Sequence, residues 1–276
     1  MAALDGRFHC AYCVLAVPYP NFPDKHLATP LVTPQRFLEY ARASGCLEGF
    51  EPPKGVLLIY KRSLMASLVE SHAAQEETRI PQLTSAYRLP RTGGAVGLLG
   101  DFGIGGPVVS ILVEEHAALD VRYFFSLGLA GGLQSDGRIG DIVLCTRAIR
   151  DEGVSHHYLA ADVEAMPSRH FTEAIARELS RRGVAFQRGA TWTIDTPYRE
   201  TVDEVRHYRA AGVLTVEMEA AALFAVASVR GVEAASAFVL SDLLGETDWT
   251  PDFGAEFLDA QLRLIADAAI QVITEL

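Results

Sequence analysis

Two glutamates with a methionine between them are the feature of the sequence with the clearest chemical use. Glu217, Met218 and Glu219 stand where a predicted strand ends and a predicted helix begins. A carboxylate accepts hydrogen bonds from two vicinal hydroxyls, as on a ribose, and methionine offers a polarizable surface to a sugar or base. The helix N-terminus is expected to hold both carboxylates ionised. From these residue types alone a solvated helix start with a buried methionine is favoured, and a sugar site is the alternative.

A further carboxylate, Asp242, follows directly after an apolar strand. Parallel α/β folds bind ligands at the carboxyl ends of their strands, so we expect Asp242 at that edge of a sheet. It lies 23 residues after Glu219, about one helix, one loop and one strand. Both carboxylates are therefore predicted to line one crevice, where a partly shielded carboxyl group can act as a general acid. Taken alone, Asp242 is favoured as a helix cap or a turn residue.

Glycines are concentrated in one part of the chain. Of the 23 glycines, 12 lie between Gly93 and Gly140. Within this part, residues 126–133 (SLGLAGGL) are typical of a strand end that turns through glycines. Glycine allows a ligand or another chain segment to approach the backbone closely, so a planar ligand is predicted to contact this stretch.

The elements that must position these residues alternate from residue 55 onward. Strands are predicted at 55–60, 95–99, 123–129, 141–146, 213–216 and 234–240. Helices are predicted at 107–119, 171–182, 219–229 and 255–274, with an apolar helical repeat through Leu64, Leu68 and Val69. Buried strands separated by helices predict a single α/β domain with a mostly parallel sheet covered on two faces.

Residues 1–53 differ from the rest of the chain. They contain seven prolines around one helical stretch, Pro34 to Ser44. We interpret them as an N-terminal extension that packs on the body or on a partner subunit, which leaves 54–276 as the α/β domain. Cys10 and Cys13 form a lone CxxC in this extension, so chance spacing is favoured over a metal or redox site.

Composition excludes several classes of protein. The 276 residues carry 24 Lys and Arg against 35 Asp and Glu, a net charge of −11, with 49% hydrophobic and 21% charged residues. This acidity disfavours nucleic acid as a partner, and the absence of a long apolar run or signal pattern predicts a cytoplasmic protein without a membrane span. No P-loop, HExxH, GxSxG or GxGxxG motif is present, and no metal or organic cofactor is expected.

Seven motifs occur in a characteristic order: GIGGP (103–107), GLAGGL (128–133), IGDIV (139–143), DEGVSHHY (151–158), TIDTPYRET (193–201), VEMEAAALF (216–224) and VLSD (239–242). This set resembles the nucleoside phosphorylase family, which includes purine nucleoside phosphorylases, uridine phosphorylases and methylthioadenosine nucleosidases. The resemblance covers about residues 54–276. It implies a twisted, partly closed sheet and a homo-oligomer, either a dimer or a hexamer.

The resemblance also assigns roles to the three acidic residues. It implies that Glu219 binds the 2′ and 3′ hydroxyls of the ribose, with Met218 packed on the sugar and Glu217 beside it. Asp242 corresponds to the acid that protonates N7 of a purine, whereas uridine phosphorylases generally lack an aspartate here.

The base-binding residues are assigned by the same resemblance. It implies that Gly131 runs along the base. Pro197, Tyr198 and Arg199 occupy the segment that contacts the base in relatives, with Pro197 in place of the usual aromatic residue.

The anion site is where the chain departs from the family. Phosphorylases place an arginine and a serine or threonine where this chain has Ser126 and Leu129. The early phosphate motif keeps only Arg62, for which a solvated helix start is the alternative. In relatives a further arginine reaches a neighbouring subunit's phosphate, and Arg88 or Arg91 corresponds to it.

The resemblance predicts a phosphorylase that converts a nucleoside, favoured as a purine nucleoside, and phosphate into a free base and a pentose 1-phosphate. Three alternatives are a nucleosidase that uses water, favoured by Ser126 and Leu129, a uridine-type phosphorylase, and a non-catalytic nucleoside-binding protein. His156 and His157 are expected to be exposed and without a role; contact with a base or with a neighbouring site is the alternative.

Overall fold

The computed structural model describes residues 19–22, 24–80, 84–245 and 248–276 of the chain. Cys10 and Cys13 lie outside these ranges. The strands are β1 (Gly55–Ile59), β2 (Gln75–Glu76), β3 (Ser85–Arg88), β4 (Val96–Gly100), β5 (Tyr123–Gly132), β6 (Ile142–Asp151), β7 (Gln187–Ile194), β8 (Thr215–Glu217), β9 (Glu233–Leu244) and β10 (Trp249–Pro251). The helices are α1 (Pro34–Ala43), α2 (Arg62–Ser71), α3 (Gly106–Ala118), α4 (Arg169–Arg181), α5 (Val202–Ala210), α6 (Ala220–Arg230) and α7 (Glu256–Glu275), with short 3-10 turns at Lys25–Leu27, Pro90–Thr92, Ser155–His157 and Pro197–Arg199.

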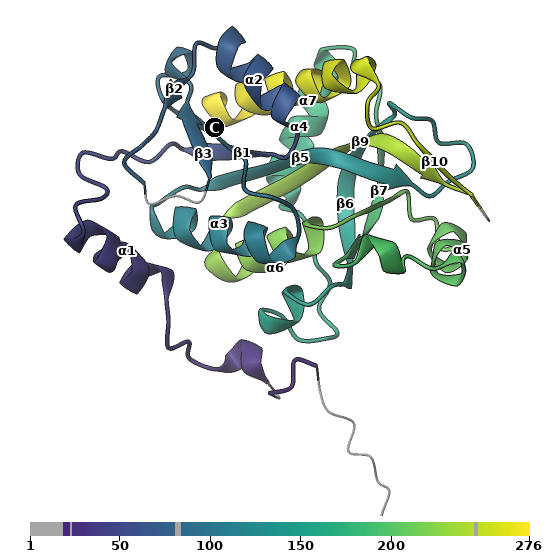
Figure 1. The fold of residues 1–276 in the computed structure, drawn as a ribbon, viewed down its shortest axis with the longest axis horizontal. Coiled ribbons are helices and arrows are strands. Elements are labelled where there is room, and N and C mark those ends of the chain that lie inside the picture. The colour runs from purple at the N-terminus through teal and green to yellow at the C-terminus, as the bar shows by residue number, and fades with distance from the viewer. Residues whose placement is uncertain (1–18, 23, 81–83, 246–247) are drawn as a thin grey trace, which may run out of the picture.

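One sheet contains every described strand, in the order β10-β9-β6-β7-β8-β5-β1-β4-β3-β2. Strand β9 pairs with β5 as well, so β5, β9, β6, β7 and β8 close on themselves while β1, β4, β3 and β2 extend from β5 (Figure 1). The predicted single α/β domain with a partly closed sheet is confirmed.

The sheet is mixed. Among the described strands, five pairings are parallel and five are antiparallel. The antiparallel pairings occur where β8 and β6 complete the closed part and at the short strands β2, β3 and β10. The expectation of a mostly parallel sheet therefore holds for the crossover units around β1 and β5 and not for the closure and the edges. At the edges, β2–β3, β3–β4 and β9–β10 follow one another along the chain without an α-helical crossover, so they pair antiparallel.

Helices cover both faces of the sheet. Figure 1 shows α2, α4 and α7 on one face and α3 and α6 on the other. Successive side chains of a strand point to opposite faces, so Leu57 and Phe125 pack in one core and Leu58 and Phe124 in the other. Both cores are built from apolar residues of the strands and of the helices that connect them.

Residues 24–53 run along the outside of the domain (Figure 1). Helix α1 begins after Thr33, whose side-chain oxygen accepts a hydrogen bond from the Arg36 backbone N–H. Its buried side chains, Leu38 and Ala41, belong to the same core as α3. The division of the chain at residue 53 stays a prediction.

All the predicted helices and strands are present, with boundaries that differ by a few residues. The largest differences concern β6, which extends to Asp151, and β9, which extends to Leu244. Asp242 is therefore inside a strand, where it pairs with Gly131 of β5 and Pro251 of β10, and does not follow the strand as expected. No described helix is long and apolar enough to cross a bilayer.

Candidate active site

A cavity of about 660 Å³ opens where several strand ends meet. Its lining includes Tyr60, directly after β1, Gly131 of β5, Glu219 at the start of α6, and Asp242 of β9. Glu219 and Asp242 thus line one cavity, as their spacing predicts. Parallel strands β1, β5 and β9 run in the same direction, so their carboxyl ends gather at this edge of the sheet.

Glu217 is buried and fully hydrogen-bonded at the junction of β8 and α6. Its Oε2 accepts the backbone N–H groups of Glu219 at 2.9 Å and Ala220 at 2.8 Å. Its Oε1 accepts the hydroxyl of Thr193, on the neighbouring strand β7, at 2.5 Å. These bonds fix the first turn of α6 and with it the position of Glu219.

Glu219 has far fewer partners. The backbone N–H of Gly105, just before α3, donates to its Oε1 at 2.5 Å. Burial, followed by repulsion from Glu217, raises the pKa of Glu219 to about 8, and burial raises the pKa of Glu217 to about 7. Desolvation of the charged forms therefore opposes the helix N-terminus, which was expected to keep both carboxylates ionised.

Asp242 is held from two sides. Its Oδ1 accepts the Ser241 hydroxyl and its Oδ2 accepts the indole N–H of Trp249, both at 2.8 Å. A β-bulge between Ala130 and Gly131 places Gly131 opposite Asp242. A Cβ at Gly131 would lie 3.1 Å from Asp242 Oδ2 and 3.0 Å from a Val216 methyl, so only glycine leaves this wall of the cavity open.

The segment 197–205 forms another wall. Pro197 and Tyr198 line the cavity and are exposed, as is Arg199, which does not line it. Glu200 lines the cavity too. Burial, with repulsion from Asp242, raises the pKa of Glu200 to about 7.

The part of the cavity lined by Tyr60 and Ser126 is polar but carries little positive charge. The Tyr60 hydroxyl lies 3.1 Å from the Ser126 hydroxyl, and burial, with repulsion from Glu219, raises the pKa of Tyr60 well above its usual value. Among the described lining residues, Lys61 is the one lysine and no arginine occurs. The Lys61 ammonium lies 2.8 Å from an Asp259 carboxylate oxygen.

The arginines predicted to bind phosphate do not line this cavity. Arg62 begins α2 beside it, but its guanidinium pairs with Asp101 at 2.8 Å and its side chain is 88% exposed. Arg88 pairs with Gly97, at the start of β4 and thus at the opposite edge of the sheet. Its guanidinium donates to the backbone carbonyls of Gly94 and Glu51.

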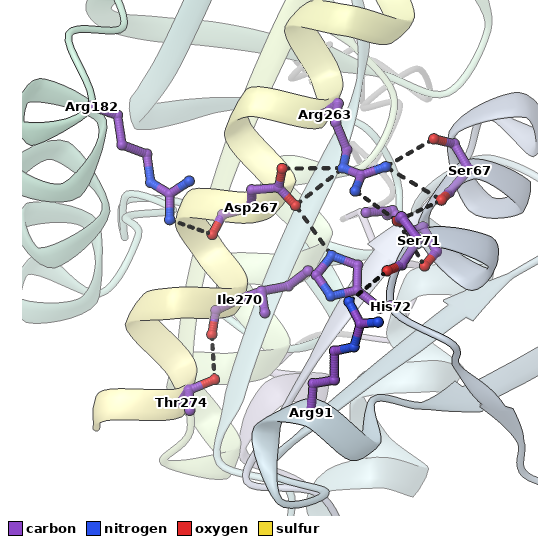
Figure 2. A network of polar contacts seen from close by, with 10 residues as sticks. Ser67, Ser71, His72, Arg91, Arg182, Arg263, Asp267, Ile270 and Thr274 are labelled. Atoms are coloured by element: carbon purple, nitrogen blue, oxygen red, sulfur yellow. Dashed lines mark hydrogen bonds and ion pairs between the residues drawn. The ribbon is translucent and has the colours of Figure 1, made fainter.

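Arg91 belongs to a network that ties α2 to α7 (Figure 2). It donates to the Ser71 carbonyl at 3.0 Å, and Arg263 donates to the Ser71 hydroxyl at 2.6 Å. Asp267 accepts from Arg263 at 3.1 Å and lies 3.2 Å from His72 Nε2. The structure therefore brings Glu217, Met218, Glu219, Gly131 and Asp242 together and leaves Arg88 and Arg91 away from the cavity.

Two functional candidates were not singled out from the sequence. Glu200 lies inside the TIDTPYRET motif. A carboxylate without an assigned role in that motif could have indicated it from the sequence. Trp249 has no local signal, because its contact with Asp242 depends on the pairing of β10 with β9.

The paired histidines lie on another part of the surface. His156 and His157 are half-buried, and the expectation that they are exposed is wrong, because Tyr19 packs edge-on against both rings. Burial, with repulsion from Lys25, lowers the pKa of His157. Across the described ranges, no group of three or more His, Cys, Asp or Glu side chains is arranged to hold a metal ion.

Comparison with protein families and curated proteins gives matches over most of the domain. The model of the Phosphorylase superfamily matches residues 67–276. The chain is 32% identical to uridine phosphorylase of Haemophilus influenzae over 146 residues, which is 48% of this chain and 58% of that protein. It is 33% identical to guanosine phosphorylase of Halorubrum lacusprofundi over 132 residues, 48% of this chain and 55% of that protein. These matches span little more than half the length of each relative.

Solved structures share the fold at lower identity. The AMP nucleosidase from Bacteroides thetaiotaomicron has a TM-score of 0.70 at 21% identity, covering 88% of this chain and 98% of that one. A uridine phosphorylase from Vibrio fischeri has a TM-score of 0.71 at 21% identity, covering 82% and 93%.

Proposed function

Because the chain belongs to the phosphorylase superfamily, we propose that it is a nucleoside phosphorylase that cleaves the N-glycosidic bond of a purine nucleoside. Phosphate is the second substrate, and the products are a free base and a pentose 1-phosphate. The observation that carries the proposal is the gathering of Glu219, Met218 and Asp242 in one cavity. These residues supply groups for the sugar and for the leaving base within the same cavity.

The sugar end is built around Glu219. One of its oxygens already accepts the Gly105 N–H, which leaves the other oxygen and the remaining lone pairs for the 2′ and 3′ hydroxyls of a ribose. Met218 packs against the ring. As the glycosidic bond breaks, the sugar becomes an oxocarbenium-like cation, and the ionised form of Glu219 stabilises that charge.

The base end is built around Asp242 and Gly131. A departing purine carries the electrons of the broken bond, so a proton delivered to N7 lowers the barrier. Asp242 is the carboxyl group proposed for that delivery, and it favours a purine over a pyrimidine. Gly131, Pro197 and Tyr198 provide the surface against which the base lies. Phosphate approaches from the side of Lys61 and the N-terminus of α2, where free backbone N–H groups favour an anion.

A second candidate is a nucleosidase in which water replaces phosphate. The observation that favours it is the absence of arginine from the described cavity lining, with Ser126 at the position where phosphorylases have one. Lys61, the one described cation there, is paired with Asp259. An AMP nucleosidase shares this fold, so the fold itself is compatible with hydrolysis.

One assay separates the candidates. Inosine, adenosine, uridine and methylthioadenosine are incubated with the protein, with and without phosphate, and release of the base is followed. Release that requires phosphate supports a phosphorylase, and release at the same rate without phosphate supports the nucleosidase. Faster cleavage of uridine than of the purine nucleosides would contradict the purine assignment. Binding without turnover would indicate a non-catalytic protein.

A further inference from the structure

The hydroxyl groups of Tyr60 and Ser126 form a pair in the cavity that the proposed sugar and base contacts do not use. Both residues line the cavity, and their hydroxyl oxygens lie 3.1 Å apart. Ser126, on the strand next to β1, is only 2% exposed. Whichever hydroxyl donates to the other, the accepting one keeps its own O–H. Among the described residues neither hydroxyl has a further partner, so the pair leaves one O–H donor unused.

The ring of Tyr60 is held in place by contacts that do not involve its hydroxyl. It packs edge-on against the ring of Phe102, with the two ring centroids 5.1 Å apart. A Cβ added to Gly128 would lie 3.2 Å from a carbon of the Tyr60 ring, so this glycine leaves room for the ring. Because these contacts are made by ring atoms, Tyr60→Phe removes the hydroxyl and keeps the packing.

The other hydroxyl and indole donors of the described lining are occupied or solvated. The Ser241 hydroxyl and the Trp249 indole N–H both donate to Asp242. The Thr201 hydroxyl donates to the glutamate of its own capping box, and the Tyr198 side chain is fully exposed. The acidic residues of the lining only accept hydrogen bonds when they are ionised. A ligand rich in acceptors therefore finds its unused hydroxyl donor in the pair.

The backbone that follows Tyr60 favours an anion. Lys61 lines the cavity and is the N-cap of α2, and its side chain makes no capping hydrogen bond. The first N–H groups of a helix have no partner within the helix, and they carry a partial positive charge. Because Tyr60 immediately precedes Lys61, the hydroxyl pair and the start of α2 adjoin each other. Together they offer the hydrogen-bond donors and the positive potential that a phosphate requires.

We propose that the Tyr60–Ser126 hydroxyl pair binds the phosphate co-substrate, with its free O–H donated to a phosphate oxygen beside the N-terminus of α2. The proposal rests on the proposed function and names the side chains that contact the anion in a cavity whose described lining has no arginine. Burial, with repulsion from Glu219, raises the pKa of Tyr60 well above its usual value. The Tyr60 hydroxyl therefore keeps its proton and stays a donor near neutral pH.

Removal of the two hydroxyls, singly and together, tests the pair. Initial rates are measured with inosine and inorganic phosphate, each varied in turn, for Tyr60→Phe, Ser126→Ala and the double variant. We expect the double variant to raise KM for phosphate by about tenfold or more, the contribution of a hydrogen bond to a charged group. KM for inosine should stay nearly unchanged. Each single variant should give a smaller increase, because the remaining hydroxyl still has an O–H to donate.

Tyr87→Phe is the matched control. Tyr87 is half-buried in β3 and does not line the cavity, so its variant should keep both KM values. Melting temperatures provide a reading without turnover. Phosphate alone should raise the melting temperature of wild type and of Tyr87→Phe, and the double variant should lose this increase while inosine still stabilises it. A purely structural role of the hydroxyls would instead weaken the response to both ligands.

The outcomes separate this proposal from the proposed function. If wild type requires phosphate and the double variant keeps the wild-type KM for phosphate, or raises both KM values equally, the hydroxyl pair is not the anion contact and the phosphorylase assignment stands. If wild type releases the base at the same rate without phosphate, the proposed function is wrong and the pair falls with it. Should the double variant fail to fold, the single variants decide, and an unchanged KM for phosphate in both of them overturns the proposal.

Discussion

Burial, more than hydrogen bonding, sets the charge of the two glutamates at the start of α6. Glu217 accepts two backbone N–H groups and a threonine hydroxyl, each of which favours its ionised form, and its pKa is still raised to about 7. The pKa of Glu219, with the Gly105 N–H as its main donor, is raised further, to about 8. Near neutral pH the pair therefore resists carrying two charges. A cation that develops beside Glu219 shifts this balance toward the ionised form, which is the behaviour required of a residue that stabilises an oxocarbenium-like state.

Removal of the Glu219 carboxylate should weaken nucleoside binding. Two hydrogen bonds from ribose hydroxyls to a charged group contribute about 3 kcal/mol together, or about 100-fold in affinity. We expect Glu219→Ala to raise the dissociation constant for inosine by about that factor, measured by calorimetry. A 2′,3′-dideoxy analogue should bind wild type and the variant equally, and an equal loss for both ligands would contradict the assignment.

The raised pKa values also predict how stability changes with pH. In the unfolded chain Glu219 ionises with a pKa near 4.5, and in the folded chain with a pKa of about 8. Between these values the folded state binds the extra proton, so the free energy of unfolding falls as pH rises from about 4.5 to 8. Glu219→Gln keeps the shape and removes this titration. Its melting temperature should exceed that of wild type by about 2 °C or more at pH 9 and by less at pH 5. Exposed Glu48, changed to Gln, should show no such pH-dependent difference.

At the scale of residues, the sequence was informative where chemistry and local structure coincide. Glu217, Met218 and Glu219 are predictable because three neighbouring residues mark a strand-to-helix junction. The contacts of Arg88 and Arg91 are not, because they depend on residues that the fold brings from elsewhere, such as the carbonyls of Glu51 and Ser71. A long arginine side chain can reach many backbone carbonyls, and the sequence does not show which of them accepts its hydrogen bond.

At the scale of elements, the bulge where β9 pairs with β5 shapes the cavity. The extra residue is Ser241 of β9, so Ala130 pairs with Leu240 and the next residue, Gly131, pairs with Asp242. A Cβ added to Gly131 would lie 2.5 Å from a methyl of Leu244 and 3.0 Å from a methyl of Val216. Val216 belongs to β8 and Leu244 to β9. Both strands would therefore have to shift to make room for the added Cβ.

Gly131→Ala should therefore overpack this junction. Overpacking of a buried site costs about 1 to 3 kcal/mol, which lowers the melting temperature by about 2 to 10 °C in a domain of this size. Binding of inosine should weaken as well, because the new methyl group lies in the cavity wall. Gly254→Ala serves as the control, since a Cβ added at Gly254 would meet nothing within 4 Å. An alanine at Gly131 that leaves both stability and binding unchanged would contradict the role of the bulge.

The elements that the sequence did not predict are short, polar or exposed. Strands β2 and β10 are exposed throughout and lack an apolar pattern, and the first half of β7 is exposed or half-buried. Edge strands of this kind form because a neighbouring strand offers unpaired backbone groups. Helix α5 was predictable, since Thr201 and Glu204 form a capping box at its start. Because α5 was not among the predicted helices, the cavity wall that carries Glu200 was not predicted either.

At the scale of the whole molecule, the closed part of the sheet explains why acidic residues collect at one point. Strands β5, β8 and β9 meet there, and each contributes a residue to the wall: Gly131, Glu217 and Asp242. The chain has a net charge of −11, and its cavity adds to that sign locally. An anionic substrate must therefore be held by a few specific groups, with Lys61 and the backbone at the start of α2 as the nearest.

The response of global stability to phosphate tests whether those groups suffice. A ligand that binds the folded state alone raises the free energy of unfolding, by about 2.7 kcal/mol at 100 times its dissociation constant. If phosphate is the co-substrate, it should raise the melting temperature of wild type, and Lys61→Met should lose most of that increase. Arg91→Ala should begin at a lower melting temperature, because it loses its bond to α2, and should keep the full increase with phosphate. If phosphate leaves the wild-type melting temperature unchanged while inosine raises it, the cavity binds the nucleoside without an anion. Water is then the nucleophile that the composition of the cavity lining favours.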